Sequence, residues 1–101
     1  MKPSIQSRLE RLVERFEEVS ALLSDASVIS NQDKFRELSR EFAEIEPVVK
    51  CFQSWQQSRD DISEAKELLK DGDADMRAMA EEELDGAEAR SDELGEELQR
   101  L

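Results

Sequence analysis

Histidine and tyrosine are absent from this 101-residue sequence, and histidine is the commonest general base and metal ligand at neutral pH. Neither a Ser-His-Asp triad nor a Cys-His pair can therefore be built. The single cysteine, Cys51, cannot form an internal disulfide, which fits a reducing compartment. No apolar run approaches the roughly 20 residues that cross a bilayer, and the N-terminus has no apolar signal-peptide core. We predict a soluble cytoplasmic protein.

Glycine is also scarce. Its three occurrences, Gly72, Gly86 and Gly95, are isolated, so no phosphate-binding loop is present. Cys51 has no histidine partner and is interpreted as a small buried hydrophobe rather than a nucleophile. Carboxylates are plentiful, but none has an evident apolar pocket to raise its pKa. We predict no catalytic and no cofactor-binding residue, and we expect that the chain is not an enzyme by itself.

Two metal hypotheses are disfavoured by the sequence. Three alternating aspartates, followed by a glutamate at the twelfth position, resemble a calcium-binding EF-hand loop: Asp71, Asp73, Asp75 and Glu82. The sixth position, which needs glycine for a sharp turn, is Met76, so helix capping explains the aspartates better. The run Glu81–Glu83 could suggest a di-iron bundle, but such sites use Glu-x-x-His pairs. We predict no metal site.

Charged residues make up 40% of the chain, and the net charge is -12. Residues 1–23 are neutral overall, residues 24–70 carry -3, and residues 71–101 carry -9. Such acidity repels nucleic acid phosphates at long range, so no direct contact with nucleic acid is expected. The acids form either a solvated face or a surface for a basic protein.

Apolar periodicity predicts a first helix over residues 4–23, with Ser4 as its N-cap. The apolar residues recur at steps of three and four, which places them on one side of a helix: Ile5, Leu9, Leu12, Phe16, Val19 and Leu23. Arg15 and Glu18, three apart, form a favourable pair. The polar segment from Ser24 to Asn31 is predicted to be a loop, with Val28 and Ile29 tucked beneath it.

A second helix is predicted over residues 32–70. Its apolar residues again follow steps of three and four for most of its length: Phe35, Leu38, Phe42, Ile45, Val49, Phe52, Trp55, Ile62, Ala65 and Leu69. Pro47 lies inside this pattern and costs about 3 kcal/mol or more in a helix interior. The chain either continues through a kink or breaks, with Pro47 in the first turn of a new helix. The uninterrupted period favours the kinked continuous helix.

A third helix is predicted over residues 73–100, with Gly72 just past the preceding helix end and Asp73 as the N-cap. Asp75 is favourable in its first turn. Its inner side is predicted to hold Met76, Ala80, Glu83 or Leu84, Ala87, Leu94, Leu98 and Leu101. Met76 and Met79 are interpreted as gap-filling core residues. Gly86 and Gly95 each cost about 1 kcal/mol relative to alanine, so the C-terminal part should fray.

These elements predict an all-α fold: an elongated, antiparallel three-helix bundle around a long, kinked central helix, forming one domain over residues 1–101. Short loops make consecutive helices antiparallel. From the helix lengths, both outer helices should cover the central one only between about residues 44 and 52. Burial on two sides explains why apolar residues there exceed one stripe: Val48, Val49, Cys51, Phe52 and Trp55.

Three segments together resemble the N-terminal domain of bacterial class-one peptide chain release factors. They are FRELSREFAEIEPV (residues 35–48), CFQSWQQ (51–57) and DADMRAMAEEEL (73–84). The resemblance extends from Met1 to Leu101 and is closest to the type that reads UAA and UAG. It implies that the chain is an N-terminal part of a longer, multidomain protein.

The resemblance implies an accessory role in translation termination. The family's stop-codon tripeptide and Gly-Gly-Gln hydrolysis loop are expected in downstream domains, since no Gly-Gly pair occurs here. This helical domain is expected near the ribosomal stalk base, with contacts to the class-two release-factor GTPase. Two alternative functions are an acidic helical adaptor or oligomerisation module, and a nucleic-acid-binding arm. The net charge argues against the arm, and the uneven helix lengths argue against a regular coiled coil. Self-association of the isolated chain stays open.

Overall fold

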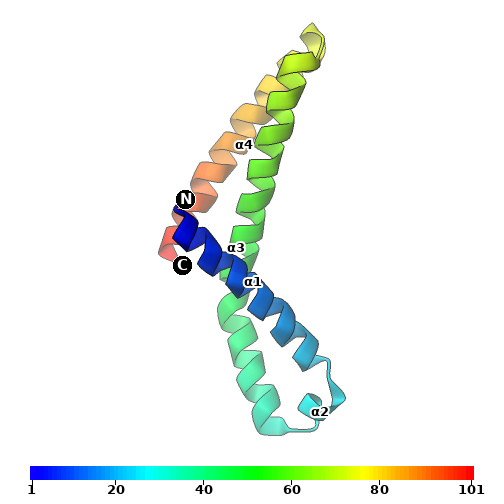
Figure 1. The fold of residues 1–101 in the computed structure, drawn as a ribbon, viewed down its shortest axis with the longest axis vertical. Coiled ribbons are helices and arrows are strands. Elements are labelled where there is room, and N and C mark those ends of the chain that lie inside the picture. The colour runs from blue at the N-terminus through cyan, green and yellow to red at the C-terminus, as the bar shows by residue number, and fades with distance from the viewer. The chain divides into compact units, whose positions relative to one another are not determined.

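The computed structural model describes the backbone of residues 1–101 and every side chain except that of Asp71. Four helices, and no strand among the described residues, make up the fold (Figure 1). The predicted all-α class is thus confirmed. The chain divides into two compact units, Met1–Lys50 and Cys51–Leu101, which we describe separately. The single domain over residues 1–101 stays a prediction.

Helix α1 (Pro3–Leu23) begins one residue before the predicted start. Ser4 is not the N-cap: Lys2 holds that position with an extended backbone, and no side chain caps the helix. The reason is Pro3, which forces the preceding residue out of the helical region and fits the first helical position, where an N–H is not needed. The proline, and not the serine, sets the start of this helix.

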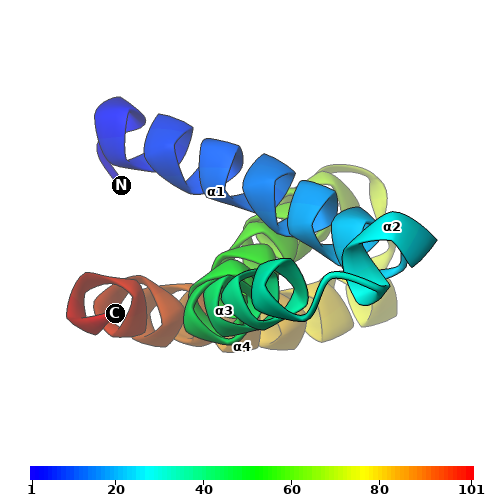
Figure 2. The ribbon, with the colours of Figure 1, turned by 90° about the horizontal axis from the view of Figure 1, so that it is seen from below.

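The segment predicted as a loop after α1 contains a one-turn helix, α2 (Ala26–Ile29). The Asp25 carboxylate caps it by accepting from the Ser27 N–H at 2.8 Å. Figure 2 shows this short helix between the end of α1 and the start of α3. Val28 is buried as predicted, but Ile29 is 54% exposed, so the second half of that prediction is wrong. Successive residues of a helix point about 100° apart, and one turn can bury only one of them.

The core of the first unit lies where α1 and α2 meet the first half of α3. Val19, Val28 and Leu38 are its buried residues. Partly buried side chains pack around them: Leu22, Leu23 and Phe42. The Phe16 and Phe42 rings stack with centroids 4.8 Å apart. The predicted stripe of residues 4–23 thus meets the first part of the stripe of residues 32–70, as antiparallel neighbours do.

Helix α3 (Gln32–Asp71) is continuous across Pro47. The alternative of a break is therefore wrong, whereas a kink stays a prediction. Proline has no N–H for the Ala43 carbonyl, so this helix lacks one of its internal hydrogen bonds. The Pro47 ring is exposed.

Gly72 joins α3 to α4 (Ala74–Arg100) in a tight turn. Its N–H donates to the Leu68 carbonyl at 3.0 Å. A Cβ atom at this position would lie 2.8 Å from that carbonyl oxygen and 3.0 Å from the Met76 Cβ, so only glycine fits. Asp73 caps α4 as predicted, accepting from the Met76 N–H at 2.9 Å, and Asp75 lies in the first turn.

The second unit is a hairpin in which α3 and α4 run antiparallel. The Cys51 Sγ lies 3.7 Å from the Leu94 carbonyl oxygen, and Asp61 contacts Arg90 nearer the turn. The buried seam holds residues at steps of three, four or seven along both helices, which share one helix face: Ser58, Ile62, Ala65, Ala80, Ala87 and Ser91. The two serines were missing from the predicted stripes. Small seam residues let two helices approach closely.

Met76 and Met79 do not fill the core, contrary to the prediction. Met76 is 46% exposed and Met79 is 72% exposed. Met79 lies one residue before the buried Ala80 and therefore points about 100° away from the seam. Of the residues predicted to be covered on two sides, Val49, Cys51 and Phe52 are buried. Coverage of residues 44–52 by both outer helices concerns the placement of the two units and stays a prediction.

Candidate functional site

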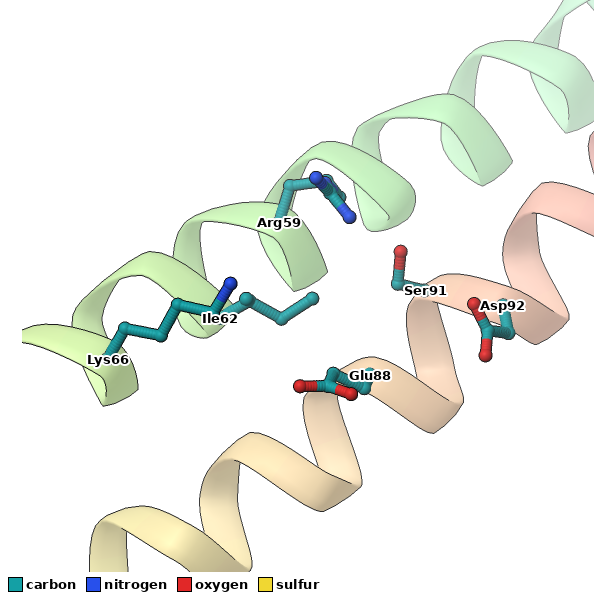
Figure 3. Close-up of a pocket in the computed structure, with 6 residues that line it drawn as sticks. All are labelled: Arg59, Ile62, Lys66, Glu88, Ser91 and Asp92. Carbon is teal, nitrogen blue, oxygen red and sulfur yellow. The ribbon is translucent and has the colours of Figure 1, made fainter. Parts of the chain in front are cut away.

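The hairpin carries a shallow hollow on one side of its seam, with a volume of about 250 Å³. Arg59, Ile62 and Lys66 line it from α3, and Glu88, Ser91 and Asp92 line it from α4. Figure 3 shows Ile62 extending from α3 toward α4 and Ser91 pointing back toward α3. Two cations on α3 and two carboxylates on α4 line the hollow together with one apolar and one hydroxyl side chain. This mixed lining and a volume below the roughly 300–1,000 Å³ of ligand pockets are typical of a surface groove, not of a substrate site.

Trp55 lies partly buried beside this groove. Its ring stacks on that of Phe52 with centroids 5.9 Å apart, and the Arg59 guanidinium carbon lies 5.9 Å from the indole centroid. A cation over an aromatic face is attracted by the ring quadrupole, by about 0.5–1 kcal/mol at an exposed site. The contact with Arg59 thus links the aromatic pair to a residue that lines the groove.

Cys51 is buried, and its Sγ is directed toward the carbonyl oxygen of Leu94. Burial raises the pKa of the Cys51 thiol, and the nearby charge of Glu97 raises it further. A raised pKa keeps the thiol protonated and poorly nucleophilic at neutral pH. The structure agrees with the interpretation of Cys51 as a small core residue.

The first unit holds a bidentate ion pair between α1 and α3. Arg15 donates from Nε to Glu41 Oε2 at 2.6 Å and from Nη2 to Glu41 Oε1 at 2.7 Å. Its Nη1 also donates to Glu18 Oε1 at 2.9 Å, as the spacing predicted. The hydrogen bond from Arg15 lowers the pKa of the Glu41 carboxyl below its usual value. The charge-assisted hydrogen bonds between Arg15 and Glu41 tie α1 to α3, so we assign this cluster a positioning role.

A second hollow, of about 300 Å³, lies along α3 in the same unit and is lined by Asp33, Arg36, Glu37 and Arg40. All four residues come from two turns of one helix, with two charges of each sign. A hollow on one helix has no facing wall to enclose a ligand. We assign it no binding role.

Helix α4 carries ten acidic and three basic residues, the largest excess of negative charge in any helix of the chain. Ten of its acidic side chains are exposed: Asp75, Glu81, Glu82, Glu83, Asp85, Glu88, Asp92, Glu93, Glu96 and Glu97. No ion pair among the described side chains engages any of them. Clustered like charges raise the free energy of the folded state and favour association with cations. This face is the most distinctive polar feature of the second unit.

The aspartates that resembled a calcium loop serve the helix. Asp73 is the N-cap, and Asp75 and Met76 lie inside α4. The side chain of Asp71 lies outside the described residues. Among the described side chains, no group of three or more acids or cysteines could hold a metal ion. Nor does any helix in that part of the chain combine the length and hydropathy needed to cross a membrane.

Comparison with known families identifies one match that covers most of the chain. The model of the PCRF domain, found in release factors, matches residues 12–101. The matched region includes most of α1, the α2 turn, the whole of α3 and the α4 hairpin, so it extends over both compact units. The chain therefore belongs to the PCRF domain family, and its role is related to release factors in translation termination.

Proposed function

We propose that this chain is the N-terminal domain of a bacterial class-one release factor, of the type that reads UAA and UAG. The PCRF match over residues 12–101 carries the proposal. The three sequence segments that resemble this class add the finer assignment of stop-codon type. The protein is then cytoplasmic, because it acts on ribosomes.

In this proposal the domain is not an enzyme and makes protein contacts. Stop-codon reading and peptidyl-tRNA hydrolysis reside in downstream domains, while this domain contacts the ribosomal stalk base and the class-two release-factor GTPase. The buried, protonated Cys51 and the mixed-charge groove support a non-catalytic role. The exposed acids of α4 support a contact with a basic protein surface rather than with RNA.

The test begins with the downstream reading frame, which should encode a Gly-Gly-Gln triplet within the next few hundred residues. The full-length factor and a form lacking residues 1–101 are then compared on ribosomes stalled at each stop codon. We expect the shortened form to retain release at UAA and UAG. We expect it to lose dissociation stimulated by the class-two GTPase. Loss of release with retained GTPase response would reject the assigned division of labour.

The contact itself can be tested with the 101-residue chain and purified stalk-base protein. Affinity should fall as salt rises, because exposed charges are screened within about 8 Å at 0.15 M. Binding that does not change with salt would place the contact on an apolar surface instead. The alternative function, an acidic adaptor or oligomerisation module, predicts a concentration-dependent molecular mass and no stalk binding.

A further inference from the structure

The tip of the α3–α4 hairpin exposes apolar side chains that the core does not use. Leu68 is 39% exposed, Met76 is 46% exposed and Met79 is 72% exposed. Two of the three methionines of the chain are therefore in this region. We call these three residues the hairpin tip; it lies at the turn between α3 and α4 in Figure 1.

The hairpin tip is held in place by its turn. The Gly72 N–H donates to the Leu68 carbonyl, and a Cβ on Gly72 would lie 3.0 Å from the Met76 Cβ, so the two chain segments meet there. The Asp73 cap fixes the first turn of α4, from which Met76 projects. Met79 is three residues on, and residues three apart share one helix face. The apolar side chains thus sit on ordered backbone.

Acidic residues surround the most exposed of these side chains. The residues four before, three after and four after Met79 are Asp75, Glu82 and Glu83, which are its neighbours on the helix surface. All three are exposed, and none takes part in an ion pair between described side chains. No cation among the hairpin's described side chains pairs with them, so cations of a partner can relieve their mutual repulsion.

We propose that the hairpin tip is a docking surface for a basic amphipathic helix of a partner protein, which places an apolar stripe on Met76 and Met79 and cations on the flanking acids. Flexible methionine side chains adapt to an irregular apolar partner. A nucleic acid does not fit this surface, because its phosphates would be repelled by the flanking carboxylates. A second copy docking tip to tip would bring like charges together. The inference does not depend on the proposed role in termination, since it concerns only the chemistry of the tip.

The probe is a synthetic 18-residue helix of leucine and lysine, with leucines at steps of three and four. A scrambled peptide of the same composition has the same charge but no apolar stripe. We expect the 101-residue chain to bind the amphipathic peptide about tenfold more tightly than the scrambled one. Equal affinities would show that charge alone attracts the peptide, and would overturn the proposal.

Matched variants locate the surface. Met79→Gln should weaken binding about tenfold, and the pair Glu82→Gln with Glu83→Gln should weaken it about as much at low salt. The controls are Ile29→Gln, at an equally apolar and 54% exposed side chain in the other unit, and Glu14→Gln with Glu17→Gln. We expect the controls to change affinity less than twofold. Controls as damaging as the tip variants would contradict a localised surface.

The methionines also report the contact directly. Dilute peroxide oxidises exposed methionines, and Met1, 49% exposed, serves as an internal reference in the same chain. Bound peptide should slow oxidation of Met76 and Met79 at least threefold while leaving Met1 unchanged. Slowing of all three would mean that the peptide protects the chain without selecting the tip, and slowing of none would mean that it binds elsewhere; either result rejects the docking surface. A doubled molecular mass without peptide would assign the tip to self-association instead.

Discussion

Arg15 and Glu41 show how one residue pair ties folding of the first unit to pH. The pair is bidentate, and the hydrogen bond from Arg15 lowers the pKa of Glu41. A carboxyl whose pKa is lower in the folded state binds fewer protons there than in the unfolded chain. The stabilisation that ionised Glu41 gives the folded state is therefore present above the ordinary glutamate pKa of 4.5. It is lost as the pH falls below that value.

Glu41→Gln should remove this pH dependence. We expect the free energy of unfolding of the parent chain to fall more steeply between about pH 5 and pH 3 than that of the variant, with the two differing most above pH 5. Urea melts at each pH provide the measurement. Glu17→Gln is the control, since Glu17 is exposed and has no ion pair among the described side chains. Parallel pH curves for parent and Glu41→Gln would show that the pair is not formed in solution.

Phe52 and Trp55 allow a test of whether the burial of a side chain affects the free energy of unfolding more than its size does. Phe52 is 1% exposed, whereas the larger Trp55 is only partly buried. We expect Phe52→Ala to lower the free energy of unfolding by about 3–5 kcal/mol, and Trp55→Ala by about 1–3 kcal/mol. Urea melts of both variants give the ranking directly. A larger loss at Trp55 would mean that the indole is more deeply packed than the structure indicates.

At the scale of elements, residue spacing predicted the bounds of the three long helices to within one residue. It missed buried positions that polar residues occupy. The predicted spans 32–70 and 73–100 differ by one residue at two of their four ends from Gln32–Asp71 and Ala74–Arg100. The stripes omitted Ser58 and Ser91 because only apolar residues were counted. Both fall on the same three-and-four spacing, and the Ser58 hydroxyl donates to the Trp55 carbonyl at 2.6 Å, which satisfies it in the seam.

The sequence could not predict which exposed residues form a surface. Met79 was assigned to the core from its hydrophobicity alone. Its position one residue before Ala80 lies off the apolar stripe, and this offset could have indicated that its side chain is exposed. The α2 turn was missed because four residues carry no measurable period, and only the Asp25 cap could have indicated it. The non-enzymatic expectation rests on the absence of histidine, the isolated glycines and carboxylates without an evident apolar pocket, and it stays a prediction.

Pro47 offers a test of how α3 tolerates an internal proline. Pro47→Ala restores an N–H for the Ala43 carbonyl and should raise the free energy of unfolding by about 1–2 kcal/mol, less than the full proline cost because the unfolded chain also gains freedom. The exposed ring leaves no cavity when removed. Pro3→Ala is the matched control, since Pro3 occupies the first helical position and should change stability by less than about 0.5 kcal/mol. A loss of stability at Pro47→Ala would mean that the proline fixes a bend that packing requires.

At the scale of the whole molecule, charge is distributed unevenly while secondary structure is nearly uniform. The net charge of -12 comes mainly from residues 71–101, and the acids of α4 outnumber its cations. The excess of acidic residues does not prevent α4 from forming, because glutamate is a good helix former. The cost is long-range repulsion within the folded chain, which a cationic partner or added salt reduces.

Salt should therefore stabilise this protein. Raising sodium chloride from about 10 mM to about 150 mM shortens the screening length from about 30 Å to about 8 Å, which weakens repulsion among the α4 carboxylates. The pair Arg15–Glu41 is weakened too, but its short bidentate contact is screened less than charges farther apart. We expect Tm, followed by circular dichroism, to rise by about 2–5 °C. Replacing Glu81, Glu82 and Glu83 by glutamine should raise Tm at low salt and reduce the response to salt. A fall in Tm with salt would mean that the attraction within ion pairs contributes more to stability than the repulsion among the α4 carboxylates takes away.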